Sequence, residues 1–107
     1  MHFTRLSFVA IGIAASIQCA EARDLDPRHQ GRILARQFCS ACHAVQAPDF
    51  GTRNVRAPSF AAIAATPGMT AMALNVFLNT SHRTMPNIIL TEDQRREIVD
   101  YILSLRK

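Results

Sequence analysis

The chain has 107 residues, with 12 Lys and Arg against 8 Asp and Glu, and it contains three cysteines. This length accommodates one domain, and an apolar share of 49% excludes wholesale disorder, which requires low hydrophobicity and high net charge. The composition also excludes collagen-like, low-complexity and disulfide-dense chains. Three cysteines cannot all pair within one chain, so at least one of them needs another explanation.

The N-terminus has the residue order of a secretory signal peptide. Arg5 precedes an apolar stretch that ends at Ile17, and a small-x-small cleavage site ends at Ala22. The apolar stretch has about 12 residues, whereas a helix that spans a bilayer needs roughly 20. We therefore expect residues 1–22 to be a cleaved signal peptide and residues 23–107 to form the mature domain in the periplasm. The alternative is a membrane anchor formed by an uncleaved N-terminus.

Cleavage after Ala22 leaves about 85 residues and two cysteines, because Cys19 leaves with the signal. Cys19 fits a lipoprotein signal poorly, since the bulky polar Gln18 directly precedes it. Near this size a hydrophobic core alone gives marginal stability. A covalent link or a large ligand is therefore expected to stabilise the mature domain.

The first predicted helix covers residues 27–38, with Asp26 as its N-cap and Pro27 at its first position. One face of this helix carries small and apolar residues: Gly31, Leu34, Ala35 and Phe38. The opposite face carries an arginine stripe, which we interpret as a solvated surface: Arg28, Arg32 and Arg36.

Two short helical segments follow a loop at 44–57. Ser59 precedes an apolar segment of one or two helical turns at 60–64, and Thr70 caps a helix that continues to Asn79. The residues of this second segment that are expected to face inward are Leu74, Phe77 and Leu78.

A second loop at 80–90 precedes the last predicted helix, which covers residues 92–105 and begins with a capping box of Thr91 and Gln94. Apolar residues cover more than half of its circumference: Ile98, Val99, Tyr101, Ile102, Leu103 and Leu105. One neighbouring helix rarely needs so wide an apolar face, so two packing partners are expected. Strand-like alternation is absent from the sequence, and the mature domain is predicted to be all-α.

The residues directly after the first helix form a Cys-x-x-Cys-His motif, with Cys39, Cys42 and His43 at its fixed positions. This spacing is the attachment signature of c-type haem. Two thiols add to the two vinyl groups of haem and form thioethers, and two intervening residues let one turn of chain present both sulfurs to one edge of the ring. The adjacent imidazole can then become an axial ligand of the iron. The motif predicts one covalent haem c as the cofactor.

Three alternative uses of this cysteine pair exist. A thioredoxin-type redox pair belongs at the start of a helix after a strand, and here a helix comes first. A tetrahedral zinc site needs a fourth ligand, for which His29 and His82 are the solitary candidates. A disulfide between Cys39 and Cys42 is compatible with export.

On these residues the mature chain resembles a small class I cytochrome c of the bacterial periplasmic type, over nearly all of residues 27–107. In that family a glycine eight residues before the first cysteine marks the crossing of the N- and C-terminal helices, and Gly31 matches it. The aromatic and aliphatic pair at this crossing is matched by Tyr101 and Ile102. Ala35 replaces an aromatic residue that the family often has, so a slightly different crossing is expected. The resemblance implies the cytochrome c fold, with three to four helices and crossed N- and C-terminal helices around a covalent haem.

A second axial ligand is expected opposite His43, and Met85 is the predicted residue. Met85 precedes Pro86 in the loop before the last helix, and members of the family present their ligand methionine from such a loop. The remaining candidates are Met69, Met72 and His82. A thioether is a soft ligand that favours ferrous iron and raises the potential. The resemblance also implies that the backbone carbonyl of Pro58 orients the His43 ring.

The sequence therefore predicts an electron carrier rather than an enzyme, passing single electrons between periplasmic redox partners. Partners with acidic docking surfaces are expected to meet exposed arginines: Arg28, Arg32, Arg36, Arg83, Arg95 or Arg96. Nucleic acid and, after signal cleavage, a membrane span are not expected, and the protein is expected to be a monomer. The alternatives are a haem subunit of a larger periplasmic dehydrogenase or oxidase complex, and a haem sensor or peroxidase-like protein with a labile Met85. Arg53, Asn54 and Arg56 are unranked candidates for contacts with the haem propionates.

Overall fold

A computed structural model describes residues 26–47, 54 and 56–107, so the predicted signal peptide and its cleavage site lie outside the described residues. The described elements are four helices and no strand: α2 (Pro27–Phe38), α3 (Phe60–Ala65), α4 (Ala71–Asn79) and α5 (Glu92–Ser104). The all-α prediction is confirmed, and the helix bounds differ from the predicted ones by one residue at most. In the part of the chain that is described, none of the helices combines the length and apolar character needed to cross a membrane.

Each helix begins at a side chain that accepts a hydrogen bond from a backbone N–H of its own first turn. Such caps satisfy amides that have no partner within the helix. Thr91 and Gln94 form the predicted capping box at the start of α5, with reciprocal bonds of 3.2 and 2.9 Å. The other cap residues are Asp26, Ser59 and Thr70.

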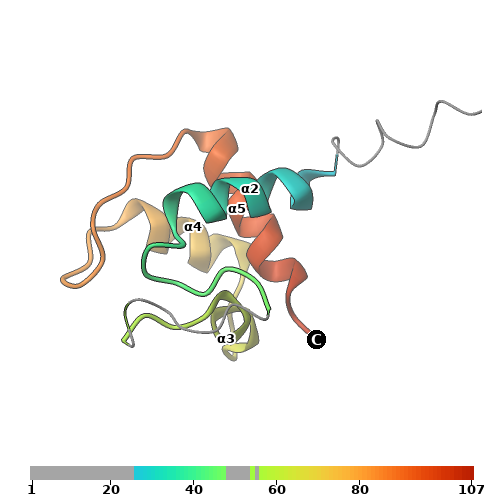
Figure 1. The fold of residues 1–107 in the computed structure, drawn as a ribbon, viewed down its shortest axis with the longest axis horizontal. Helices are drawn as coiled ribbons and strands as arrows, with labels where there is room; N and C mark the ends of the chain where they lie inside the picture. Colours follow the sequence, from blue (N-terminus) through green and yellow to red (C-terminus); the bar gives the residue numbers. More distant parts are fainter. Residues whose placement is uncertain (1–25, 48–53, 55) are drawn as a thin grey trace, which may run out of the picture.

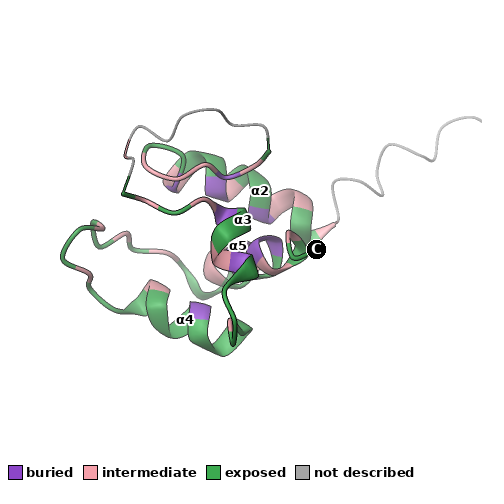
Figure 2. Ribbon diagram, turned by 90° about the horizontal axis from the view of Figure 1, so that it is seen from below, coloured by how far each residue is buried: buried purple, intermediate pink, exposed green. Residues whose placement is uncertain are grey.

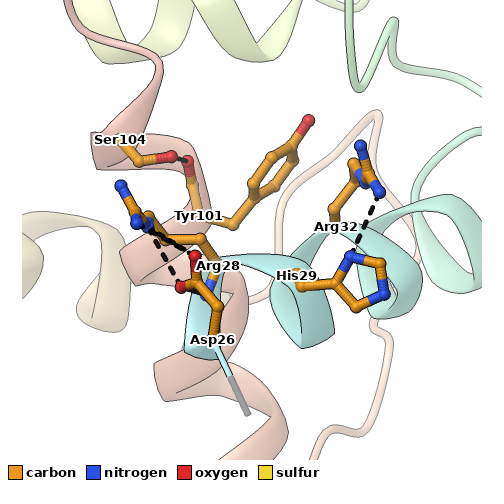
Figure 3. Close-up of polar contacts among 6 residues, drawn as sticks. All are labelled: Asp26, Arg28, His29, Arg32, Tyr101 and Ser104. Atoms are coloured by element: carbon orange, nitrogen blue, oxygen red, sulfur yellow. Dashed lines mark hydrogen bonds and ion pairs between the residues drawn. The ribbon is translucent and has the colours of Figure 1, made fainter. Parts of the chain in front are cut away.

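The start of α2 carries a local ion pair beside the end of α5 (Figure 3). Arg28 donates to both oxygens of Asp26 and holds the pKa of that carboxyl below its ordinary value through these hydrogen bonds. The pair is exposed, and it therefore adds little to stability. On α5 the hydroxyl of Ser104 donates to the backbone carbonyl of Tyr101 at 2.6 Å.

Helices α2 and α5 cross in close contact (Figure 1), and the crossing is centred on Gly31. A Cβ atom built on Gly31 would lie 2.0 Å from the carbonyl oxygen of Glu97 and 2.7 Å from the Cβ of Tyr101. The two backbones therefore touch, which only a residue without a side chain permits. Ala35 lies one turn further along α2 and is completely buried. The small side chain at this position suits a crossing as close as this one.

The core is built around α5, whose buried residues are Ile98, Val99, Tyr101 and Ile102. Helix α5 packs against α2, α3 and α4, so its wide apolar face has more partners than the two that were predicted. Figure 2 shows the buried residues gathered where these helices meet. In α4, Leu74 is buried and Leu78 packs against the core as expected, whereas 57% of the surface of Phe77 is exposed. The Phe77 ring lies at the wall of a large cavity instead.

We expect Gly31→Ala to destabilise the protein, because its methyl group would collide with the backbone of α5. Alanine favours an isolated helix by about 1 kcal/mol over glycine. A loss of stability in the variant would therefore come from the collision at the helix crossing and not from helix propensity. A net loss of about 1–3 kcal/mol is expected, as for other overpacked sites, and guanidinium unfolding of the haem-loaded protein would measure it. Gln37→Ala, at an exposed position of the same helix, is the control and should change stability by less than about 0.5 kcal/mol. Equal stability of the Gly31→Ala and Gln37→Ala variants would contradict the close crossing.

Candidate functional site

A cavity of about 1270 Å³ lies among the helices and the two long loops. Its volume is at or above the upper end of the roughly 300–1,000 Å³ that is usual for small-molecule and cofactor sites. The five residues that the sequence analysis predicts for the site all line it: Cys39, Cys42, His43, Pro58 and Met85. Ile98 and Ile102 of α5 contribute an apolar wall. The structure thus brings together residues that are up to 46 positions apart in the sequence.

The two thiols are presented by the turn that follows α2. The backbone N–H groups of Cys42 and His43 both donate to the carbonyl of Cys39, at 3.2 and 2.9 Å, and this closes one tight turn. Cys39 is 8% exposed and Cys42 is half-buried. Both are free thiols, so the weighed disulfide between them is not present.

The burial of Cys39 makes its thiol unsuited to redox exchange. It raises the pKa of the Cys39 thiol to about 11, because the thiolate would lose its hydration. Thiols that work in redox exchange have lowered pKa values instead, usually from a helix N-terminus or a nearby cation. A thioether carries no charge, so the same burial does not oppose covalent attachment of an apolar group at this sulfur.

The imidazole of His43 is fixed by a hydrogen bond of 2.7 Å between its Nδ1 and the backbone carbonyl of Pro58. A carbonyl oxygen only accepts hydrogen bonds, so Nδ1 must carry the proton. In the neutral ring Nε2 then keeps its lone pair, which is the form that binds a metal. The Pro58 carbonyl thus selects the tautomer as well as the orientation of the ring.

The two residues that follow His43 are tied to other parts of the fold. The backbone N–H of Phe60 donates to the carbonyl of Ala44 at 2.9 Å, and the buried hydroxyl of Tyr101 donates to the carbonyl of Val45 at 2.6 Å. The Phe60 ring lies between the His43 and Tyr101 rings, with centroid distances of 5.6 and 6.4 Å. The segment that carries His43 is therefore held by α3 and by α5.

Sequence reasoning missed both of these backbone contacts. The one available signal was the tyrosine on the apolar face of the last helix, since a buried Tyr hydroxyl needs a hydrogen-bond partner. Nothing in the sequence indicated that the partner is the carbonyl of Val45.

The alternative ligand candidates occupy different positions. Met72 is 77% exposed and is not among the residues that line the cavity. Met69 lines the cavity but also packs against the hydrophobic core. His82 lines the cavity with its Nε2 at 2.7 Å from the carbonyl of Phe77. Met85 is half-buried in the loop at 80–90, and Pro86 beside it also lines the cavity.

The described lining of the cavity is largely apolar, and Arg56 is its one residue with a formal charge. The side-chain oxygen of Asn54 accepts a hydrogen bond of 3.0 Å from the backbone N–H of Arg56, which fixes these two lining residues together. Arg53 lies outside the described residues. Within the described ranges, no three His, Cys, Asp or Glu side chains gather in a group that could hold a bare metal ion.

An all-α fold with a Cys-x-x-Cys-His segment on a large apolar cavity is the arrangement of a c-type cytochrome. Over 106 residues, which make up 99% of each chain, the sequence is 32% identical to cytochrome c-552 of Bradyrhizobium diazoefficiens. No protein-family model and no solved structure matches the chain. The full-length identity shows that the chain belongs to the class I c-type cytochromes, electron-transfer proteins that hold haem c covalently. Family membership confirms the expectations of a haem cofactor and of an electron carrier rather than an enzyme.

We expect Tyr101→Phe to lower stability while leaving the aromatic packing in place. The variant keeps the ring beside Phe60 but leaves the carbonyl of Val45 without its buried donor. An unsatisfied buried group of this kind costs about 1–3 kcal/mol, and thermal unfolding of the haem-loaded protein would measure it. Ser104→Ala removes a hydroxyl-to-carbonyl bond from an exposed residue of the same helix and should have little effect. A Tyr101→Phe variant as stable as the Ser104→Ala variant would contradict a role for this hydrogen bond.

Proposed function

We propose that this cytochrome carries single electrons between periplasmic redox partners, with its haem iron ligated by His43 and Met85. The observation that carries the proposal is the convergence of both thiols, the oriented imidazole and the loop methionine on one apolar cavity. When bound, the haem supplies reversible one-electron chemistry at its iron. With His43 and Met85 both bound to it, the iron would have no open position for oxygen or a substrate.

Two cysteines and one histidine of the chain would hold the haem. Cys39 and Cys42 would anchor it through thioethers, and His43 would ligate the iron through Nε2, the atom that the Pro58 contact leaves unprotonated. Hydrogen bonding to the other ring nitrogen also makes the ligating nitrogen more basic.

Four observations favour Met85 as the second ligand over the other candidates. Met72 lies away from the cavity, and Met69 is packed against the core. The Nε2 atom of His82 is engaged with the carbonyl of Phe77. Met85 lies in a loop, so its sulfur can reach the iron without unwinding a helix. The soft thioether favours ferrous iron and gives the carrier a raised potential.

The haem carboxylates would pair with the guanidinium group of Arg56. This side chain brings the one formal charge to the described lining of the cavity, and the contact with Asn54 fixes its backbone beside the site. Pairing a guanidinium with a propionate offsets the cost of placing a carboxylate near an apolar cavity.

We further propose that residues 1–22 direct export and are then removed. The support is the order of a positive residue, a short apolar stretch and a small-x-small site. Covalent haem c is attached outside the cytoplasm, and export is therefore part of the same proposal.

We expect Met85→Ala to abolish the weak far-red absorption band that ferric haem shows when a methionine is its ligand. The same variant should have a lower reduction potential, because the ferrous state loses its soft ligand. Met72→Ala is the matched control, and both the band and the potential should survive in it. A far-red band in the Met85→Ala protein would contradict ligation by Met85. A wild-type protein that lacks the band at neutral pH would favour the sensor or peroxidase-like alternative.

Partners with acidic docking surfaces are proposed from the charge pattern around the site. The described lining has no carboxylate, and the arginines Arg32 and Arg36 are exposed on α2, which leads into the Cys-x-x-Cys-His turn. A positive surface attracts an acidic partner and raises the rate of encounter.

We therefore expect the ferrous protein to react with hexacyanoferrate(III), an anion, at a rate that falls as salt is added, because salt screens the attraction. With a cationic cobalt(III) phenanthroline oxidant the rate should rise with salt. Arg56→Gln should slow the anionic reaction more than Arg96→Gln, which removes an equal charge from an exposed pair with Asp93. Equal effects of the two variants would show that the net charge of the protein, and not Arg56, governs the approach of hexacyanoferrate(III). Stopped-flow absorbance provides the rates.

A further inference from the structure

The loop at 80–90 that carries Met85 has few backbone hydrogen bonds. Among the hydrogen bonds of the described chain, residues 81–90 make none between one backbone and another. An irregular segment without such bonds relies on side chains for its position. A methionine sulfur is a weak ligand, so whatever holds this loop also governs whether Met85 stays on the iron.

One side-chain contact lies on the N-terminal side of Met85. The Nε2–H of His82 donates to the carbonyl of Phe77 at 2.7 Å, because a carbonyl can only accept. The imidazole also stacks on the Phe77 ring, with a centroid distance of 4.0 Å and an interplanar angle of 21°. His82 thereby fastens the first part of the loop to the last turn of α4.

A second contact lies on the C-terminal side of Met85. Arg95, in the first turns of α5, donates from Nε to the side-chain oxygen of Asn75 at 2.7 Å and from a terminal nitrogen to the carbonyl of Leu90 at 3.4 Å. Asn75 belongs to α4 and Leu90 ends the loop. The guanidinium thus joins the last part of the loop to the same helix that His82 contacts.

Side chains of the loop and of α4 also line a small pocket of about 10 Å³, with Phe77, Leu78, Met85 and Pro86 among them. That is at the lower limit of the room a single water molecule needs. The same four side chains line the large cavity, so the loop and α4 together form part of its wall.

We propose that His82 and Arg95 are positioning residues that hold the Met85 loop on α4 and thereby keep Met85 on the iron. The proposal rests on Met85 being the axial ligand. It assigns His82 a role as an anchor and Arg95 a role inside the protein, in place of the ligand and docking roles that the sequence left open for them.

The test is a titration of the ferric haem-loaded protein with imidazole, which competes with Met85 for the iron and removes the far-red band. His82→Phe keeps a ring for stacking on Phe77 but loses the donor, and Arg95→Ala loses both of its bonds. Each variant should bind imidazole about five- to tenfold more tightly than the wild type, the factor expected when one hydrogen bond no longer opposes loop opening. Arg95→Lys keeps one donor and should recover part of the difference.

Arg96→Ala is the matched control, because its guanidinium pairs with Asp93 on its own helix. Its imidazole affinity should stay within about twofold of the wild type. Unchanged affinity in both His82→Phe and Arg95→Ala would overturn the proposal, and so would a loss of unfolding stability without a change in affinity. Equal tightening in Arg96→Ala would also overturn it. A wild-type protein without the far-red band would instead overturn the ligation by Met85 on which the proposal rests.

Discussion

The contact between the backbones of α2 and α5 at Gly31 is the constraint from which the site follows. With the carbonyl of Glu97 so close to Gly31, the two helices can approach this closely only where a residue without a side chain stands. The end of α2 then fixes where the Cys-x-x-Cys-His turn begins. The same crossing directs Ile98 and Ile102 of α5 to the wall of the cavity. The attachment turn and the apolar wall opposite it are thus set by one steric condition.

His43 is linked to this crossing through a short chain of contacts. Tyr101 lies at the crossing and holds the carbonyl of Val45, two residues after His43. The Phe60 ring packs between the rings of His43 and Tyr101, and the carbonyl of Pro58 accepts a hydrogen bond from Nδ1 of His43. A substitution that shifts the helix crossing would therefore also shift the imidazole of His43, because α5 and the segment after His43 share a buried hydrogen bond. This link connects the packing of the two helices with the orientation of the His43 ring.

Much of this arrangement could be predicted from sequence, because the features concerned are local or have a fixed spacing. The caps at Asp26, Thr70 and Thr91 depend on residues within one turn, and the haem motif depends on five consecutive positions. Gly31 is predicted at the crossing from the family resemblance, because it lies eight residues before Cys39. Contacts made by loops follow no fixed spacing in the sequence. The hydrogen bond from Tyr101 to Val45 and the contacts of His82 and Arg95 could therefore be found only in the structure. Phe77 shows the limit of periodicity: it lies on the expected side of α4, but that side adjoins the cavity rather than packed side chains.

The decisive measurement is the intact mass of the exported protein under denaturing conditions, taken with its ferric absorption spectrum. We expect a polypeptide of residues 23–107 that keeps one haem after denaturation and shows the far-red band of methionine ligation when folded. A denatured mass equal to that of the bare polypeptide would contradict it, because haem held through Cys39 and Cys42 cannot dissociate.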